Sequence, residues 1–290
     1  MTASLWAVAS GIGFGLFQSL NRRALVDIED PYVSTFLNLV IAALALLGVA
    51  LATEDLTRLL DAGAWPLVAF AAAGVVHFLL GWTFLNLSQR RIGAARTSPL
   101  LTMTPLFALI VAAIMLGQLP GASALAAIVP MVAGAYLVSG GGEEARGADA
   151  LPGLACALMW AVSPVFTVEG LEGLDSPLLG VTLGMIASVA AYGVFLLGRG
   201  RSLRGAVIAR EALAFKVLAG VLVALATWWR WLAIDGTDVA VVLALALVSV
   251  PVVLFLSPLL VGRHLERVTP KVWIGAGLVV AGALLLIGAG

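Results

Sequence analysis

Ten continuous apolar runs constrain the fold of this chain more than any other feature of its sequence. Each run is close to the roughly 20 residues that a helix needs to cross the hydrocarbon of a bilayer. The runs occupy residues 5–21, 32–52, 65–87, 97–117, 121–139, 151–169, 177–198, 212–234, 238–261 and 271–289. Backbone polar groups in lipid must be satisfied within the segment, which favours helices. We therefore predict an all-α membrane protein with ten transmembrane helices.

Composition agrees with this class and excludes several others. Hydrophobic residues make up 62% of the 290 residues and charged residues 11%, far below the roughly 25% charged residues of soluble proteins. Sixteen basic residues balance sixteen acidic ones, so nothing indicates a nucleic-acid partner. Cys156 is the only cysteine, which excludes an intrachain disulfide and a cysteine-rich metal site. We expect no metal and no cofactor; the expected partners are the lipid bilayer and a small-molecule substrate.

Basic residues predict how the chain is oriented, because cytoplasmic loops retain Arg and Lys. They gather in the connections after the first, third, fifth, seventh and ninth runs, whereas the other connections hold Arg58 and the acidic stretches "TEDLTRLLD", "EGLEGLDSP" and "DGTD". We therefore predict a multi-pass protein of the cytoplasmic (inner) membrane with both termini outside. Arg22 and Arg23 follow the first apolar run, so we interpret residues 5–21 as a retained span and not as a cleaved signal.

The two halves of the chain resemble each other. A shift of 146 residues pairs Leu5 with Leu151, Phe14 with Trp160, Pro31 with Pro177, Trp82 with Trp228 and Pro105 with Pro251. We predict a first five-helix repeat at 1–140, a cytoplasmic linker at 141–150 and a second repeat at 151–290. Because each repeat has an odd number of spans, the second enters the membrane upside down, as in inverted-repeat transporters.

The segments "RRIGAARTSPLLTMTPLFALIVAAIMLGQ" and "LLVGRHLERVTPKVWIGAGLVVAGALLLIG" resemble the two repeats of EamA-type carriers in the drug/metabolite transporter superfamily. The resemblance implies ten helices in two inverted bundles around a central cavity, and export of small metabolites. Two departures argue against proton-driven export of cationic drugs. Gln118 replaces the acidic residue that survives as Glu266 in the second half, and the first span holds Gln18 and no glutamate.

Arg230 is the least expected charge in the chain, since it lies among Trp228, Trp229 and Trp231 near the outer end of a span. Two interpretations stay open. The tryptophans could form an interfacial belt from which Arg230 reaches the lipid headgroups, or pairs with Asp235 or Asp238. Alternatively, the guanidinium faces inward and binds a substrate carboxylate while the indole rings receive an apolar group.

His77 is the clearest ionisable residue deep within a span, and such residues usually face an interior or a watery cavity. It is a candidate for binding substrate or a proton, or else a neutral imidazole bonded between helices. Pro105 and Pro251 match across the repeat and are predicted to kink their helices beside the cavity. Glycines in "GIGFGL" predict close helix packing. The complete set of candidate substrate-binding residues is His77, Trp82, Asn86, Ser98, Thr102, Trp160, Ser163, Trp228, Arg230, Trp231 and Ser249.

These observations predict a secondary transporter that moves a small organic metabolite, an amino acid or similar carboxylate or zwitterion, outward by alternating access. Export of drugs or hydrophobic amines is the alternative, followed by a channel-like or structural membrane protein. An enzyme is not expected, because the sequence lacks G-x-S-x-G and H-E-x-x-H motifs and carries no pair of carboxylates within its spans. Coupling to a proton or a counter-substrate, and a monomeric or homodimeric state, stay open.

Overall fold

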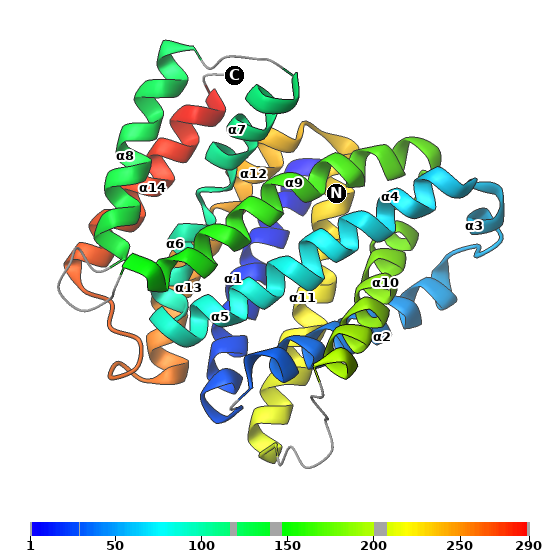
Figure 1. The fold of residues 1–290 in the computed structure, drawn as a ribbon, viewed down its shortest axis with the longest axis horizontal. Helices are drawn as coiled ribbons and strands as arrows, with labels where there is room; N and C mark the ends of the chain where they lie inside the picture. The colour runs from blue at the N-terminus through cyan, green and yellow to red at the C-terminus, as the bar shows by residue number, and fades with distance from the viewer. Residues whose placement is uncertain (1, 29, 117–120, 140–146, 200–207, 289–290) are drawn as a thin grey trace.

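A computed structural model describes residues 2–28, 30–116, 121–139, 147–199 and 208–288 (Figure 1). Within these ranges the chain is helical and contains no strand. The elements are α1 (Ala3–Asp27), α2 (Pro31–Thr53), α3 (Arg58–Asp61), α4 (Ala64–Gly74), the π-helix η1 (Val75–Gly81), α5 (Trp82–Ile92), α6 (Ala94–Leu101), α7 (Thr104–Leu116), α8 (Ala122–Val138), the short 3₁₀ turn η2 (Gly147–Ala150), α9 (Leu151–Gly173), α10 (Pro177–Gly198), α11 (Arg210–Gly236), α12 (Val239–Ala246), α13 (Ser249–Val261) and α14 (Pro270–Gly288).

All ten apolar runs form helix over the described residues, but they are not equal in length. Nine helical segments among the described residues are long and apolar enough to cross a membrane. The run predicted at 121–139 forms the shorter α8, of 17 residues. Residues 141–146 of the predicted linker at 141–150, and Gln118, lie outside the described residues. The all-helical membrane class is therefore confirmed.

Helix boundaries follow from local chemistry. Proline opens α2, α10 and α14, where its missing N–H has no helical partner to lose. The Asp30 side chain accepts from the Tyr32 N–H at 2.8 Å, and the Ser176 hydroxyl accepts from the Leu179 N–H at 3.2 Å. Such caps satisfy donors that the first turn leaves unpaired.

Two predicted spans are each divided into two helices. Residues 97–117 form α6 and α7, with a break at Thr102–Met103, and residues 238–261 form α12 and α13, with a break at Leu247–Val248. Proline cannot bond to the carbonyl four residues earlier, so the helix is interrupted just before Pro105 and Pro251. Each proline lies in the first turn of the second helix. Each pair of helices still forms one apolar segment that is long enough to cross a membrane, Ala94–Val111 and Val241–Val261.

Helix α1 runs through the middle of the bundle, against α11 on one side and α12 and α13 on another (Figure 1). Gly13 approaches Ala226 of α11, and Gly11 and Gly15 approach the chain around the α12–α13 break. Small residues permit this close approach, which agrees with the packing role predicted for "GIGFGL". In the same way α9 packs on α4, η1, α5 and α7, while α8 and α14 pair at one edge of the molecule.

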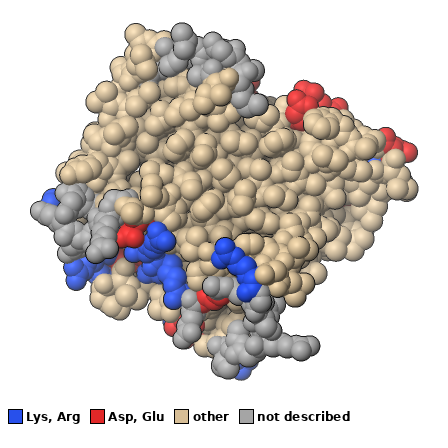
Figure 2. Space-filling view, viewed as in Figure 1, with Lys and Arg blue, Asp and Glu red and all other residues tan. Residues whose placement is uncertain are grey.

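Figure 2 shows Lys and Arg side chains gathered at one end of this face, with a few acidic side chains among them, and Asp and Glu side chains at the opposite end. We call the end where α1 and α5 finish the basic end; there Arg23 contacts Glu211 and Arg90 donates to the Ile28 carbonyl. We call the end where α4 begins and α9 finishes the acidic end; there Trp65 donates to Glu169. An uncharged band separates the two ends in this view, as expected for a surface in contact with lipid.

Candidate functional site

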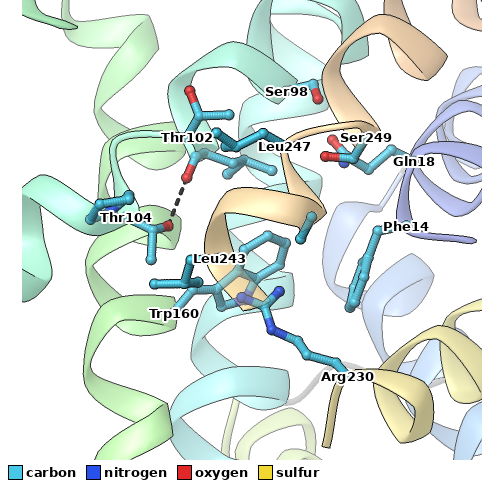
Figure 3. Close-up of a pocket in the computed structure, with 13 residues that line it drawn as sticks. Phe14, Gln18, Ser98, Thr102, Thr104, Trp160, Arg230, Leu243, Leu247 and Ser249 are labelled. Carbon is cyan, nitrogen blue, oxygen red and sulfur yellow. Dashed lines mark hydrogen bonds between the residues drawn. The ribbon is translucent and has the colours of Figure 1, made fainter. Parts of the chain in front are cut away.

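A small pocket lies where α1, α6, α7, α9, α11, α12 and α13 meet. Its volume is about 50 Å³, and both helix breaks contribute to its wall. The lining residues are Phe14, Gln18, Ser98, Leu101, Thr102, Thr104, Pro105, Trp160, Arg230, Leu243, Ala246, Leu247 and Ser249 (Figure 3). We call this the central pocket.

Arg230 supplies the charge of the central pocket. Its guanidinium is directed toward Trp160 and Leu243 and lies 5.8 Å from the centre of the Phe14 ring (Figure 3). The residue is 7% exposed and forms no ion pair with Asp235, Asp238 or any other acid among the described residues. Helical side chains lean toward the N-terminus of their helix, here toward the interior, so Arg230 does not extend toward lipid headgroups at the acidic end.

Neutral polar groups surround this charge. The Oε1 of Gln18 and the hydroxyl of Ser98 are buried and have no hydrogen-bond partner in the protein. Thr102 donates to the Pro99 carbonyl and Thr104 to the Leu101 carbonyl, both at 2.7 Å. Buried polar atoms are normally paired, so Gln18 and Ser98 are free to bind a ligand or water.

Trp160 forms the aromatic wall of the central pocket and is held from behind. It stacks on His77, with ring centres 5.2 Å apart and planes 8° apart, and its Nε1 donates to the His77 carbonyl at 3.3 Å. The Nδ1 of His77 lies 2.8 Å from the Ser163 hydroxyl. His77 itself is 4% exposed and does not line the pocket. The interhelical hydrogen bond considered for His77 is therefore present, and it positions Trp160.

An apolar cleft of about 460 Å³ adjoins the central pocket and shares Trp160 and Leu243 with it. Its walls come from Ala108 and Val111 of α7, the second half of α9 and the start of α12. Glu169, which is exposed, lies at its far end. The cleft thus runs from the central pocket toward the acidic end; we call it the outer cleft.

Buried aromatic and amide side chains pack together between α1, α5 and α11. Phe17 packs on Trp82 with ring centres 5.6 Å apart, and beyond them lies a buried amide cluster. Asn21 donates to Asn86 at 3.0 Å and to Gln89 at 2.8 Å, while Lys216 donates to Asn21 at 2.5 Å. These buried groups satisfy one another's hydrogen bonds without solvent.

Arg22 and Glu266 form a buried ion pair at the basic end. Arg22 Nε donates to Glu266 Oε1 at 2.6 Å, and the carboxylate also accepts the backbone N–H groups of Ala94 at 3.1 Å and Ala95 at 3.0 Å. These N–H groups open α6, so the carboxylate caps that helix from another part of the chain. Gly93, at φ 80°, lets the backbone pass within reach of Glu266.

Comparison with known families identifies the first half of the chain. Residues 1–140 match the sequence model of the EamA-like transporter family. Residues 1–140 belong to that family. It is a family of the drug/metabolite transporter superfamily, and its members are transporters and not enzymes.

Two further comparisons bear on the chain as a whole. No curated protein matches it. A solved structure, described only as "Crystal structure of protein", has a TM-score of 0.61 at 20% sequence identity and covers 96% of this chain and 97% of its own. At that identity the likeness concerns the fold alone, over both the EamA-like part and the remainder.

The structure brings together five of the candidate substrate-binding residues predicted from this EamA-like sequence. Ser98, Thr102, Trp160, Arg230 and Ser249 all line the central pocket. Of the two predicted kink residues, Pro105 lines it as well, whereas Pro251 is exposed on the other face of α13.

The other candidates lie outside the central pocket for identifiable reasons. Trp82 is buried against Phe17 and Phe78, and Trp231 stacks on Phe70 with ring centres 5.7 Å apart. Trp228 packs against the largest apolar core cluster. Asn86 belongs to the amide cluster, and Ser163 bonds His77 behind Trp160.

Gln18, Thr104 and Lys216 were not among the candidate site residues predicted from the sequence. Gln18 interrupts the first apolar run and Thr104 directly precedes the matched Pro105, so both were visible signals of the pocket. The amide cluster around Lys216 is formed by helices that are distant in sequence, so no residue spacing in the chain predicts it. Among the described residues, no group of three His, Cys, Asp or Glu side chains could hold a metal ion.

Proposed function

We propose that this protein is a secondary carrier that exports a small organic carboxylate or zwitterion across the cytoplasmic membrane by alternating access. Membership of the EamA-like family supports transport of a small molecule. Arg230 is the observation that supports a carboxylate substrate. Its buried guanidinium has no acidic partner among the described residues, and it lines a pocket that contains unpaired polar atoms. Guanidinium groups bind carboxylates with paired, charge-assisted hydrogen bonds.

We further propose that the ten spans form two inverted repeats, 1–140 and 151–290, joined by a cytoplasmic linker at 141–150. The packing supports this arrangement, because contacts recur when the halves are exchanged. The first helix α1 contacts α11, α12 and α13, and its counterpart α9 contacts α4, α6 and α7. Both halves contribute walls and one helix break each to the central pocket, which suits a site opened alternately to either side.

Ligand-induced stabilisation tests the proposed site. Purified protein is heated with amino acids, other carboxylates, nucleosides or hydrophobic amines, since a ligand at 100 times its Kd stabilises the folded state by about 2.7 kcal/mol. We expect carboxylates to raise the Tm of the wild type and of Arg58→Ala, an arginine at the acidic end, but not of Arg230→Ala. If only amines raise the Tm, the carboxylate hypothesis is wrong and export of hydrophobic amines is supported instead.

Flux and topology measurements test the mechanism. A ligand from this screen should enter proteoliposomes with saturation and counter-exchange, whereas a pore would show neither. Epitope tags within 141–150 should be reached only from the cytoplasmic side, and tags at both termini only from outside. A linker tag reached from outside the cell would overturn the inverted arrangement.

A further inference from the structure

The central pocket is too small to hold a whole metabolite. A buried water needs about 10–15 Å³ of such space, so about 50 Å³ holds a few water molecules or one carboxylate group. The outer cleft, which shares Trp160 and Leu243 with the pocket, offers about 460 Å³. A molecule whose charged head contacts Arg230 must therefore place most of its body in the outer cleft.

The two spaces differ in chemistry. Neutral oxygen and nitrogen atoms of Gln18, Ser98 and Ser249 accompany Arg230 in the central pocket. The outer cleft is walled by apolar side chains such as Ala108, Val111 and Val165, apart from Glu169. The site consequently has one cationic, hydrogen-bonding end and one extended apolar end.

An ammonium group beside the carboxylate would lack a counter-charge. No acidic residue is among the described residues that line the central pocket. Glu169 follows Trp160 by nine residues of α9, which places its backbone about 13 Å further along the helix. An ammonium in the head group would instead lie close to Arg230, and two like charges about 6 Å apart repel even at an effective dielectric constant near 20.

Resting on the proposed function, we infer that the substrate is an amphipathic organic anion, not a zwitterion. Its carboxylate occupies the central pocket at Arg230, and its aryl or alkyl body occupies the outer cleft between α7, α9 and α12. Trp160 lies at the junction of the two spaces and offers its ring to the first carbons of the body.

Calorimetric titration of the protein in nanodiscs tests this inference. The same titration into empty nanodiscs measures partition of the probe into lipid, and this signal is subtracted. The probes are butyrate, hexanoate and octanoate, then 3-phenylpropionate against phenylalanine, which differ in the ammonium group. We expect affinity to rise about fourfold for each added methylene, and phenylalanine to bind at least about tenfold more weakly than 3-phenylpropionate. Hexanamide, which lacks the charge, should bind far more weakly than hexanoate.

Two variants and one control variant assign these effects to the two spaces. Val165→Phe fills the outer cleft and should abolish the gain in affinity from butyrate to octanoate. Val194→Phe, at a 71% exposed position of α10 outside the cleft, should preserve that gain. Arg230→Gln should remove the preference for hexanoate over hexanamide.

The outcomes separate the inference from the proposed carrier function. Phenylalanine binding as tightly as 3-phenylpropionate, or a flat chain-length series, overturns the amphipathic anion and leaves a carrier of small or zwitterionic carboxylates. Wild-type affinities that Arg230→Gln does not change overturn the carboxylate site itself, and with it both proposals.

Discussion

Replacing Glu266 with alanine should destabilise the protein more than any exposed ion pair could. The Glu266 side chain is 1% exposed and accepts from the Arg22 side chain, which is 10% exposed, and from two backbone N–H groups at the start of α6. Its removal leaves a buried guanidinium and two buried donors unpaired. Breaking a buried ion pair in this way costs about 3–5 kcal/mol.

Glu211→Ala is a matched control. The Nη2 of Arg23 and the Oε1 of Glu211 are also 2.6 Å apart, but the Glu211 side chain is 65% exposed. An exposed pair contributes about 0–1 kcal/mol, so the two variants differ chiefly in burial. At roughly 2 °C per kcal/mol for a chain of this size, Glu266→Ala should lower the Tm in detergent by about 6–10 °C, and Glu211→Ala by about 2 °C or less.

The double variant Arg22→Met with Glu266→Ala refines this prediction. Removing both charges also removes the unpaired guanidinium, so the double variant should be more stable than Glu266→Ala alone. Equal Tm values for Glu266→Ala and Glu211→Ala would refute the reasoning from burial. A double variant less stable than Glu266→Ala would show that contacts other than Glu266 stabilise Arg22 in the folded protein.

Two glycine positions provide further tests, each with its own control. Gly93→Ala should disrupt the cap, because a Cβ would lie 2.7 Å from both Glu266 carboxylate oxygens at φ 80°; Gly63→Ala, at φ 73° with nothing within 4 Å, should cost only the roughly 1–2 kcal/mol of the left-handed backbone. Thermal denaturation in detergent measures the difference between them. Gly74→Ala should prevent α4 from packing on α10, since its methyl group would overlap the Gly184 carbonyl, whereas Gly193→Ala meets no atom within 4 Å. The yield of monodisperse protein should fall for Gly74→Ala alone, and normal yields for both would contradict the close contact.

Hydropathy is sufficient to locate the helices of this chain, because each span must be apolar over its whole length. It does not locate breaks within them. Pro105 and Pro251 match across the predicted repeat and mark where a helix can bend or be interrupted. The interruption falls before each proline, where the carbonyls of residues 101 and 247 have no proline N–H to accept.

The polar residues of the site were predicted with mixed success for a related reason. When a helix is apolar on all sides, the spacing of its hydrophobic residues does not show which side faces the pocket. Arg230 could be singled out because its charge is costly anywhere else in lipid. Trp228 and Trp231 fit an apolar core equally well, and only packing against Phe70 and its neighbours decides their position.

The π-helix η1 lies between α4 and α5, and it determines the rotation of one of these helices relative to the other about their common axis. Backbone bonding to the fifth residue, in place of the fourth, adds a residue to the turn, and each residue of an α-helix corresponds to about 100° of rotation. On one side of η1, Gly74 meets α10; on the other, Asn86 and Gln89 meet Asn21. Deleting a single residue between 75 and 81 would turn one of these two interfaces away from its partner by about 100°, so the length of this segment determines whether both interfaces can form together.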